Sequence, residues 1–216
     1  LNELTYQLND LSKNASFKII DQTTDGQATT CVLGVEGLCL DDPITIGACD
    51  NGMLYSSEKF NNLMCDKNID VIVWGAKGYP GAIRSPKMYG WIEMHKDTNN
   101  IKFISVKTPL ENPAKDFIVT GVFTFKKARY FLDAVKSMKS RKAKINGEYY
   151  VDMAINDAIS LGYRCSVLEI DRYIGWGTPN ELNTFKYWQS CFHKWDSHPY
   201  RFELDPNIAR ITPATN

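Results

Sequence analysis

The chain has 216 residues, of which 44% are hydrophobic and 23% charged, as in an ordinary folded domain and unlike a disordered or fibrous chain. Lys plus Arg and Asp plus Glu number 25 each, so no basic surplus indicates a nucleic-acid or anionic-membrane partner. No apolar run nears the roughly 20 residues of a membrane-spanning helix, and the six cysteines lack zinc-site or disulfide-scaffold spacing, so we expect one cytoplasmic domain over 1–216.

The first part of the chain predicts strands that alternate with helices. Apolar residues at helical spacing indicate helices, and short β-branched runs between turn-forming residues indicate strands. The expected elements are a helix at 3–11, a strand at 17–20, a helix at 28–38, a strand at 44–49, a helix at 56–66 and a strand at 71–74. The strand at 44–49 is apolar enough to be buried on both faces.

The second part continues with three strands and then mostly helices. The expected elements are strands at 88–94, 101–106 and 117–125, helices at 126–139 and 150–161, a strand at 165–170 and a helix at 179–195. This order predicts an α/β fold with a mostly parallel central sheet and helices on both faces. Ligands of such sheets bind beyond the carboxyl ends of the strands, which directs attention to the loops after Ile20, Cys49, Val119 and Ile170.

Asp50 is the first candidate for chemistry, because it follows a predicted strand directly and precedes Asn51 and Gly52. A carboxylate at this place suits Mg²⁺, which takes oxygen ligands and often uses one or two protein carboxylates together with substrate phosphates. Asp-Asn-Gly is also a strong turn sequence, so Asp50 could instead cap the turn. The residue alone leaves both interpretations open.

Two biased segments have alternative interpretations. The basic run 136–144 could hold phosphates, although such runs more often form the solvated end of a helix. The aromatic segment 184–195 could form a homo-oligomer contact, although aromatic helices more often pack in a core.

Six segments in this order resemble the sugar-1-phosphate nucleotidyltransferase (nucleoside-diphosphate-sugar pyrophosphorylase) family: TTDGQATTCVLG, DDPITIGACDNG, YGWIEM, ISVKTPLENPAKDFIVTGVFTF, NGEYYVDMAIN and GWGTPNEL. No single segment is specific, but their order and spacing extend over about residues 21–190. The resemblance implies a Rossmann-like nucleotidyltransferase fold of the glycosyltransferase A type. It also implies an NTP and a sugar 1-phosphate as substrates, Mg²⁺ as cofactor, and a place in nucleotide-sugar and polysaccharide biosynthesis.

The same resemblance suggests roles for residues on the nucleotide side. Gly26 matches the family's glycine at which the nucleobase approaches the backbone, where a Cβ would interfere. The alternative is an ordinary turn glycine. Asp50 matches the catalytic Asp that holds Mg²⁺ between the α-phosphate of the nucleotide and the attacking sugar phosphate.

On the sugar side, the resemblance assigns Thr120 and Gly121 to a backbone segment that closes on the sugar. Glu148 matches a carboxylate that accepts hydrogen bonds from sugar hydroxyls, and its alternative role is a helix-start acid favoured by the helix dipole. Lys107 lies near the family's Glu-Lys-Pro signature and could neutralise the sugar phosphate, although the preceding Glu is absent.

Two departures from the family pattern bear on activity. Gly175 stands where the family has a second metal ligand, and the nearest carboxylate is Asp171. The family's glycine-rich phosphate loop, with its Arg and Lys, has no counterpart before Leu1; 75–87 imitates it but follows the wrong strand and is expected to be a mobile loop. The alternatives are an A-type glycosyltransferase and a non-catalytic sugar-nucleotide-binding regulatory protein.

Overall fold

The computed structural model describes residues 15–96 and 98–195. The predicted helix at 3–11 therefore lies outside the described residues. The described residues fall into two units, one within residues 20–174 and one that combines 15–19 with 175–195. The single domain over 1–216 stays a prediction.

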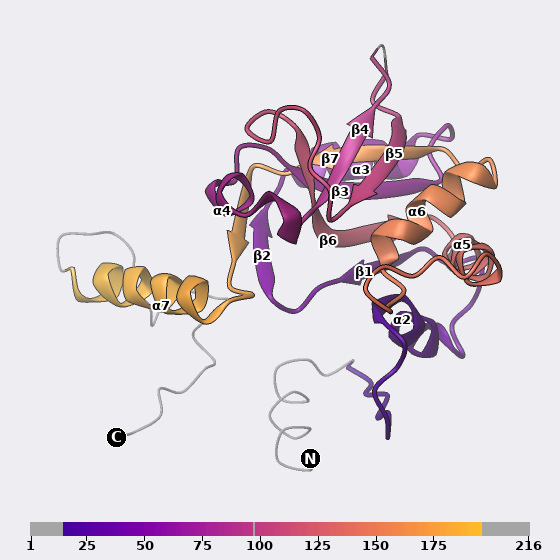
Figure 1. The fold of residues 1–216 in the computed structure, drawn as a ribbon, viewed down its shortest axis with the longest axis horizontal. Coiled ribbons are helices and arrows are strands. Elements are labelled where there is room, and N and C mark those ends of the chain that lie inside the picture. Colours follow the sequence, from indigo (N-terminus) through magenta and orange to yellow (C-terminus); the bar gives the residue numbers. More distant parts are fainter. Residues whose placement is uncertain (1–14, 97, 196–216) are drawn as a thin grey trace. The chain divides into compact units, whose positions relative to one another are not determined.

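A six-stranded sheet forms the centre of the 20–174 unit (Figure 1). Its main path runs β5 (Ile101–Val106), β4 (Gly90–Met94), β6 (Phe117–Phe125), β3 (Val71–Ala76) and β7 (Cys165–Glu169), and β1 (Ile44–Gly47) also pairs with β6. Among these ladders only β3 with β7 is parallel, so the prediction of a mostly parallel sheet is wrong.

The position of β6 explains this error. Strands β1, β3 and β4 are each antiparallel to β6, and β7 is parallel to β3, so these four strands share one direction. The helix-strand alternation indicated this common direction. Because β6 runs the other way between them, most neighbouring pairs become antiparallel, a result of long-range pairing that local periodicity does not encode.

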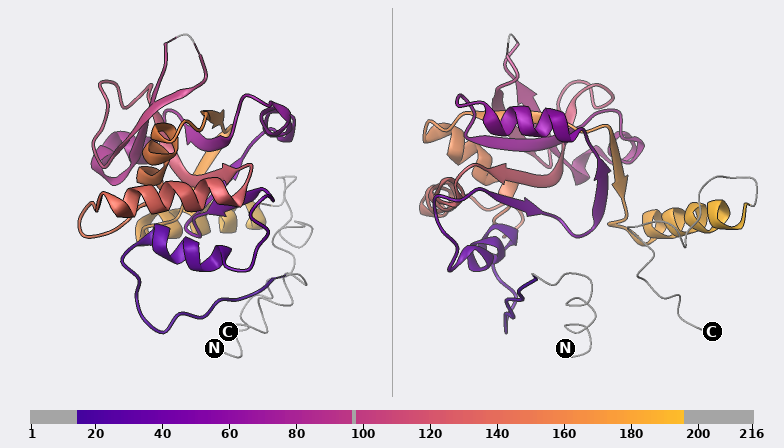
Figure 2. Two further views of the ribbon diagram at one scale, coloured as in Figure 1. Left: turned by 90° about the vertical axis from the view of Figure 1, so that its right-hand side faces the viewer. Right: turned by 180° about the vertical axis from the view of Figure 1, so that it is seen from behind.

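Helices cover both faces of the sheet, as predicted (Figures 1 and 2). Helices α3 (Ser57–Cys65), α5 (Ala128–Ser140) and α6 (Val151–Ser160) pack on it, and α2 (Gln27–Val35) packs against α5 and α6. Strand β3 shows why both faces need cover, since its alternate side chains enter two cores. Val73 joins Phe131 of α5 in one core, whereas Trp74 joins Phe60 of α3 in the other.

Several elements differ from the sequence predictions. Residues 17–20 form no strand, and β1 is half exposed instead of buried on both faces. The expected mobile loop at 75–87 contains the short helix α4 (Pro80–Arg84) and the start of the 3₁₀ turn η1 (Pro86–Met88). A two-stranded sheet of β2 (Asn51–Leu54) and β8 (Arg172–Gly175) was not predicted. Both strands are only four residues long, too short for a clear alternation.

Helix α7 (Pro179–Lys194) belongs to the other unit and agrees with its prediction within a residue. Thr178 and Glu181 form a reciprocal capping box at its start, and Pro179 occupies the first helical position, which together fix where the helix begins. None of the helices in the described ranges has the length and apolar character that a membrane span requires.

Candidate functional site

The candidate site lies at a gap along one edge of β6. Strand β3 pairs with β6 over nearly its whole length, so β1 and β4 share the opposite edge. There β4 pairs with Phe117 and Ile118, and β1 pairs with β6 from Val122 onward. The carboxyl end of β1 and the start of β4 therefore meet across the intervening residues of β6, which include Thr120 and Gly121.

Gly121 lets the exit of β1 come close to β6. Its φ of 80° lies in the left-handed region, and a Cβ there would stand 3.1 Å from the Cβ of Ala48. The N–H of Ala48 donates to the Gly121 carbonyl over 3.1 Å, which holds the two segments together. Gly121 also lies at an irregularity of the pairing between β3 and β6. The register shifts there, because Val73 pairs with Phe123 but Gly75 pairs with Val119.

Asp50 and Asn51 leave β1 directly beside this gap. The Asn51 Nδ2 donates to the Thr120 carbonyl over 3.0 Å and lies 3.4 Å from Asp50 Oδ1. Within the described residues, Asn51 Oδ1 is buried and has no hydrogen-bond partner. Asp50 is exposed. The structure therefore brings Asp50, Thr120 and Gly121 together, with Asn51 as a connecting residue that the sequence argument did not single out.

The Thr120 side chain faces away from this gap. Its hydroxyl is buried and donates to the Trp74 carbonyl over 2.9 Å. The carbonyls of Thr120 and Gly121 accept hydrogen bonds from Asn51 and Ala48, and the use of this backbone in sugar binding stays a prediction.

Lys107 lies at the other side of the gap, next to the start of β4. Its N–H donates to the Tyr89 carbonyl over 3.1 Å, and its Nζ donates to the Met88 carbonyl over 2.9 Å. The Nζ also lies 5.6 Å from the centroid of the Tyr150 ring. Lys107 has a φ of 60°, an uncommon conformation for a residue with a side chain, so the local fold holds it in place.

The segment from Glu148 to Asp152 lies beside Lys107, through the ring of Tyr150. Glu148 is exposed and closes a tight turn with Ile145 through two backbone hydrogen bonds of 3.0 Å. Burial and a hydrogen bond to Glu148 raise the pKa of the Tyr150 phenol. Asp152 stands in the first turn of α6, and its Oδ2 lies 2.5 Å from where a Cβ of Gly90 would be.

Gly26, in the motif TTDGQATTCVLG, packs against the backbone of Tyr149 in the segment 148–152. A Cβ at Gly26 would overlap the Tyr149 N and lie 2.7 Å from the Tyr149 O. The Tyr149 backbone donates to the Asp25 carbonyl over 3.0 Å and accepts from the Ala28 N–H over 2.9 Å. The space left by the absent Cβ is thus taken by protein backbone, which gives this glycine a structural reason whether or not a nucleobase also binds.

Part of the basic run also reaches this region. Lys144 pairs with Asp25 over 3.3 Å, and the nitrogens of Lys139 and Lys144 lie 5.5 and 4.8 Å from the centre of the Tyr149 ring. A hydrogen bond from Thr29 and the nearby lysines hold the pKa of Asp25 below its usual value. These two lysines are therefore engaged beside the Gly26 motif, whereas Lys136 is exposed on α5.

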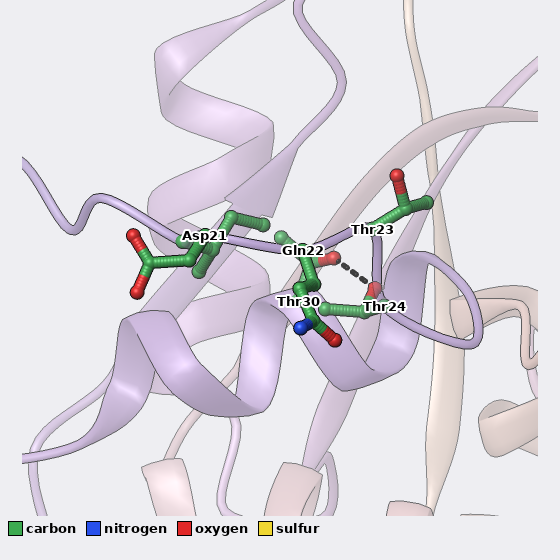
Figure 3. Close-up of a pocket in the computed structure, with 6 residues that line it drawn as sticks. Asp21, Gln22, Thr23, Thr24 and Thr30 are labelled. Carbon is green, nitrogen blue, oxygen red and sulfur yellow. Dashed lines mark hydrogen bonds between the residues drawn. The ribbon is translucent and has the colours of Figure 1, made fainter.

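An open pocket of about 350 Å³ lies next to this motif (Figure 3). It is lined by Ile20, Asp21, Gln22, Thr23, Thr24 and Thr30. The hydroxyls of Thr24 and Thr30 face each other at 2.6 Å, and Thr24 also donates to the Gly26 carbonyl over 3.0 Å. The pocket offers hydroxyl, amide and carboxylate groups, which is a lining suited to a polar ligand.

The oxygen donors near the gap fit Mg²⁺ only with help from a substrate. Across the described residues no cluster of three or more His, Cys, Asp or Glu side chains could hold a metal by itself. Asp50 provides one exposed carboxylate, and Mg²⁺ commonly takes one or two carboxylates plus phosphate oxygens. Asp171 is an unsuitable second ligand, because its N–H bonds to Leu54, at the far end of β2 and roughly 13 Å along the strand from Asp50.

The contacts connect the separate sequence motifs into one region. Gly26 lies against the Tyr149 backbone, and the next residue, Tyr150, lies beside Lys107. Asp152 contacts the position of Gly90 at the start of β4, next to the gap beside Gly121. Sequence reasoning missed Asn51, Tyr150, Asp152 and the pocket residue Gln22, although all four lie in or beside the motifs that it named. Tyr150 and Asp152 lie in the motif that contains Glu148, so the other polar residues of that motif were a signal that could have found these two.

Comparisons with known proteins agree with this architecture. A nucleoside-diphosphate-sugar pyrophosphorylase from Vibrio cholerae RC9 matches with a TM-score of 0.65 and 19% identity, over 86% of this chain and 76% of its own. A Bacillus anthracis protein proposed to be a glucose-1-phosphate thymidylyltransferase, in complex with sucrose, matches with 0.63 and 15%, over 87% and 71%. The inositol-1-phosphate CTP transferase of T. maritima matches with 0.60 and 12%, over 86% and 70%.

At these identities the likeness shows the fold alone, which this chain shares with these three proteins. No protein-family model matches the sequence, and no curated protein matches it at a significant level.

Proposed function

We propose that the protein is a nucleotidyltransferase that joins an NTP to the phosphate of a sugar-type molecule and releases pyrophosphate. Two observations support this most: the fold shared with nucleotidyltransferases, and the hydrogen bond by which Asn51, next to Asp50, holds the Thr120 carbonyl beside Gly121. The exposed Asp50 carboxylate suits a metal ion with phosphate ligands, and the Lys107 cation suits a phosphate.

The chemistry needs mainly position and charge neutralisation. An oxygen of the sugar phosphate attacks the α-phosphorus of the NTP, the new P–O bond forms, and the bond to pyrophosphate breaks in line. Lys107 would neutralise the sugar phosphate, and the pocket at Gln22 and Thr24 would hold the nucleotide. When bound by Asp50 and the phosphates, Mg²⁺ supplies charge neutralisation at the reacting phosphorus.

A regulatory sugar-nucleotide-binding protein is the second candidate. It is favoured by Gly175, which offers no side-chain ligand where the resembling family has one, and by the lack of a three-residue metal-binding cluster among the described residues. Such a protein would bind the same ligands without turnover.

Pyrophosphate release from a panel of NTPs and hexose 1-phosphates with Mg²⁺ tests the proposal. We expect release with at least one pair, and loss of release in Asp50→Asn with an unchanged melting temperature. Binding of a nucleotide sugar without any release would favour the regulatory candidate. Full activity of Asp50→Asn would exclude the metal role of Asp50.

A further inference from the structure

The carboxylate of Asp152 stands at the edge of the gap and has no assigned role in the chemistry above. Its Oδ2 occupies the space that a side chain at Gly90 would fill, 2.5 Å from the Cβ position. The same Cβ position is 3.3 Å from Val119, so Asp152 packs against the point where β4 starts beside β6. A glycine at position 90 is therefore what lets this carboxylate reach the sheet edge.

The surroundings of Asp152 supply a complementary charge. The positive charge of Lys107 favours the ionised form of Asp152 and so acts to lower its pKa. The Asp152 charge helps to raise the pKa of Tyr150, whose ring lies 5.6 Å from the Lys107 nitrogen. Lys107 and Asp152 form no ion pair within 4 Å in the structure described. A cation and a carboxylate are thus held near each other, Lys107 by its bonds to Tyr89 and Met88 and Asp152 by the start of α6.

Glu148 is less well placed for the same task. It lies in an exposed tight turn, and its carboxylate interacts with the Tyr150 phenol. Burial raises the pKa of the partly buried Asp152, whose carboxylate also accepts a hydrogen bond from its own backbone N–H. A carboxylate has about four acceptor positions, so Asp152 keeps acceptor capacity at a sheltered place where ligand hydroxyls gain more than in open water.

We propose that Asp152, rather than Glu148, is the carboxylate that accepts hydrogen bonds from the hydroxyl groups of the phosphorylated substrate, with Lys107 binding its phosphate. This inference rests on the proposed function and specifies its acceptor side: a polyol phosphate such as a hexose phosphate. A simple role as a helix-start acid does not explain the placement, because such an acid needs no burial: Glu58 in the first turn of α3 is exposed to water.

Binding measurements separate these roles without relying on turnover. Wild type, Asp152→Asn, Glu148→Gln and Glu58→Gln would each be titrated with a panel of hexose 1-phosphates and with ethyl phosphate, which has the phosphate but no ring hydroxyls. We expect Asp152→Asn to bind the best hexose 1-phosphate about 10- to 100-fold more weakly, the worth of hydrogen bonds to a charged acceptor. Its ethyl phosphate affinity should equal that of wild type, and Glu58→Gln should match wild type with both ligands.

A second variant moves the carboxylate without removing it. Gly90→Ala puts a Cβ 2.5 Å from the Asp152 Oδ2, so it should cause the same selective loss of hexose 1-phosphate affinity. Unchanged binding by Asp152→Asn, an equal loss of both ligands, or a selective loss in Glu148→Gln alone would overturn the inference. If wild type releases pyrophosphate and Asp152→Asn keeps the same KM for the sugar phosphate, this inference fails while the proposed function stands. If wild type binds no hexose phosphate, both fail.

Discussion

Gly26 offers the sharpest test of how the site is built. In Gly26→Ala the new Cβ would overlap the Tyr149 N, so the hydrogen bonds from Tyr149 N to Asp25 O and from Ala28 N to Tyr149 O must lengthen or break. Each such bond contributes about 1 kcal/mol. A side chain at a φ of 130° adds about 1–3 kcal/mol of backbone strain, so the total loss should be about 3–5 kcal/mol.

Gly37→Ala is the matched control. Gly37 also has a positive φ, of 85°, but a Cβ there would meet nothing within 4 Å, so the cost should be only about 1 kcal/mol. Urea unfolding of both variants measures the difference, and each kcal/mol should lower the melting temperature by about 2–4 °C at this chain length. Equal losses in the two variants would refute the close approach of Gly26 to Tyr149.

Three further changes test other parts of the account. Asp50→Asn should lower kcat by at least about 100-fold and leave the free energy of unfolding unchanged, as seen by activity and urea unfolding together. Arg141→Ala should lower the free energy of unfolding by about 3 kcal/mol in urea, because it removes the cation from the Asp157 carboxylate, which is only 3% exposed. A loss under about 1 kcal/mol would mean that this ion pair behaves like one on the surface.

Burial raises the pKa of Asp70, but hydrogen bonds from Arg164 outweigh it and keep that pKa below its usual value. The stability that Asp70 contributes is present above its unfolded pKa of about 3.9 and lost as the pH falls through the folded value. Asp70→Asn should therefore be about 1 kcal/mol less stable than wild type at pH 7, with a smaller difference near pH 3; a constant difference would contradict this.

The spacing of apolar residues predicts most helices and strands of this protein well. It does not predict the direction of β6, which depends on pairing between strands far apart in the sequence. The strands at 101–106 and 117–125 and the helix at 179–195 match the structure within a residue, because their apolar spacing is clear. The antiparallel insertion of β6 depends on partners up to 81 positions apart, such as Ile44 and Phe125, and short periodicity contains no information on them.

The candidate site shows the same division. Motif order indicated Asp50 and Gly121, and the structure brings them to one gap through Asn51. The role of Gly26 in packing and the position of Asp152 depend on Tyr149 and Gly90, which are distant in sequence. Neither contact could be predicted from the spacing of residues along the chain.

The most direct test of the central claim is a ³¹P NMR time course of the protein with Mg²⁺, an NTP and a hexose 1-phosphate. We expect pyrophosphate and a nucleoside-diphosphate sugar to appear in equal amounts, and both signals to vanish in Asp50→Asn. Unchanged substrate signals across the whole panel, or release of inorganic phosphate without a diphosphate sugar, would contradict it.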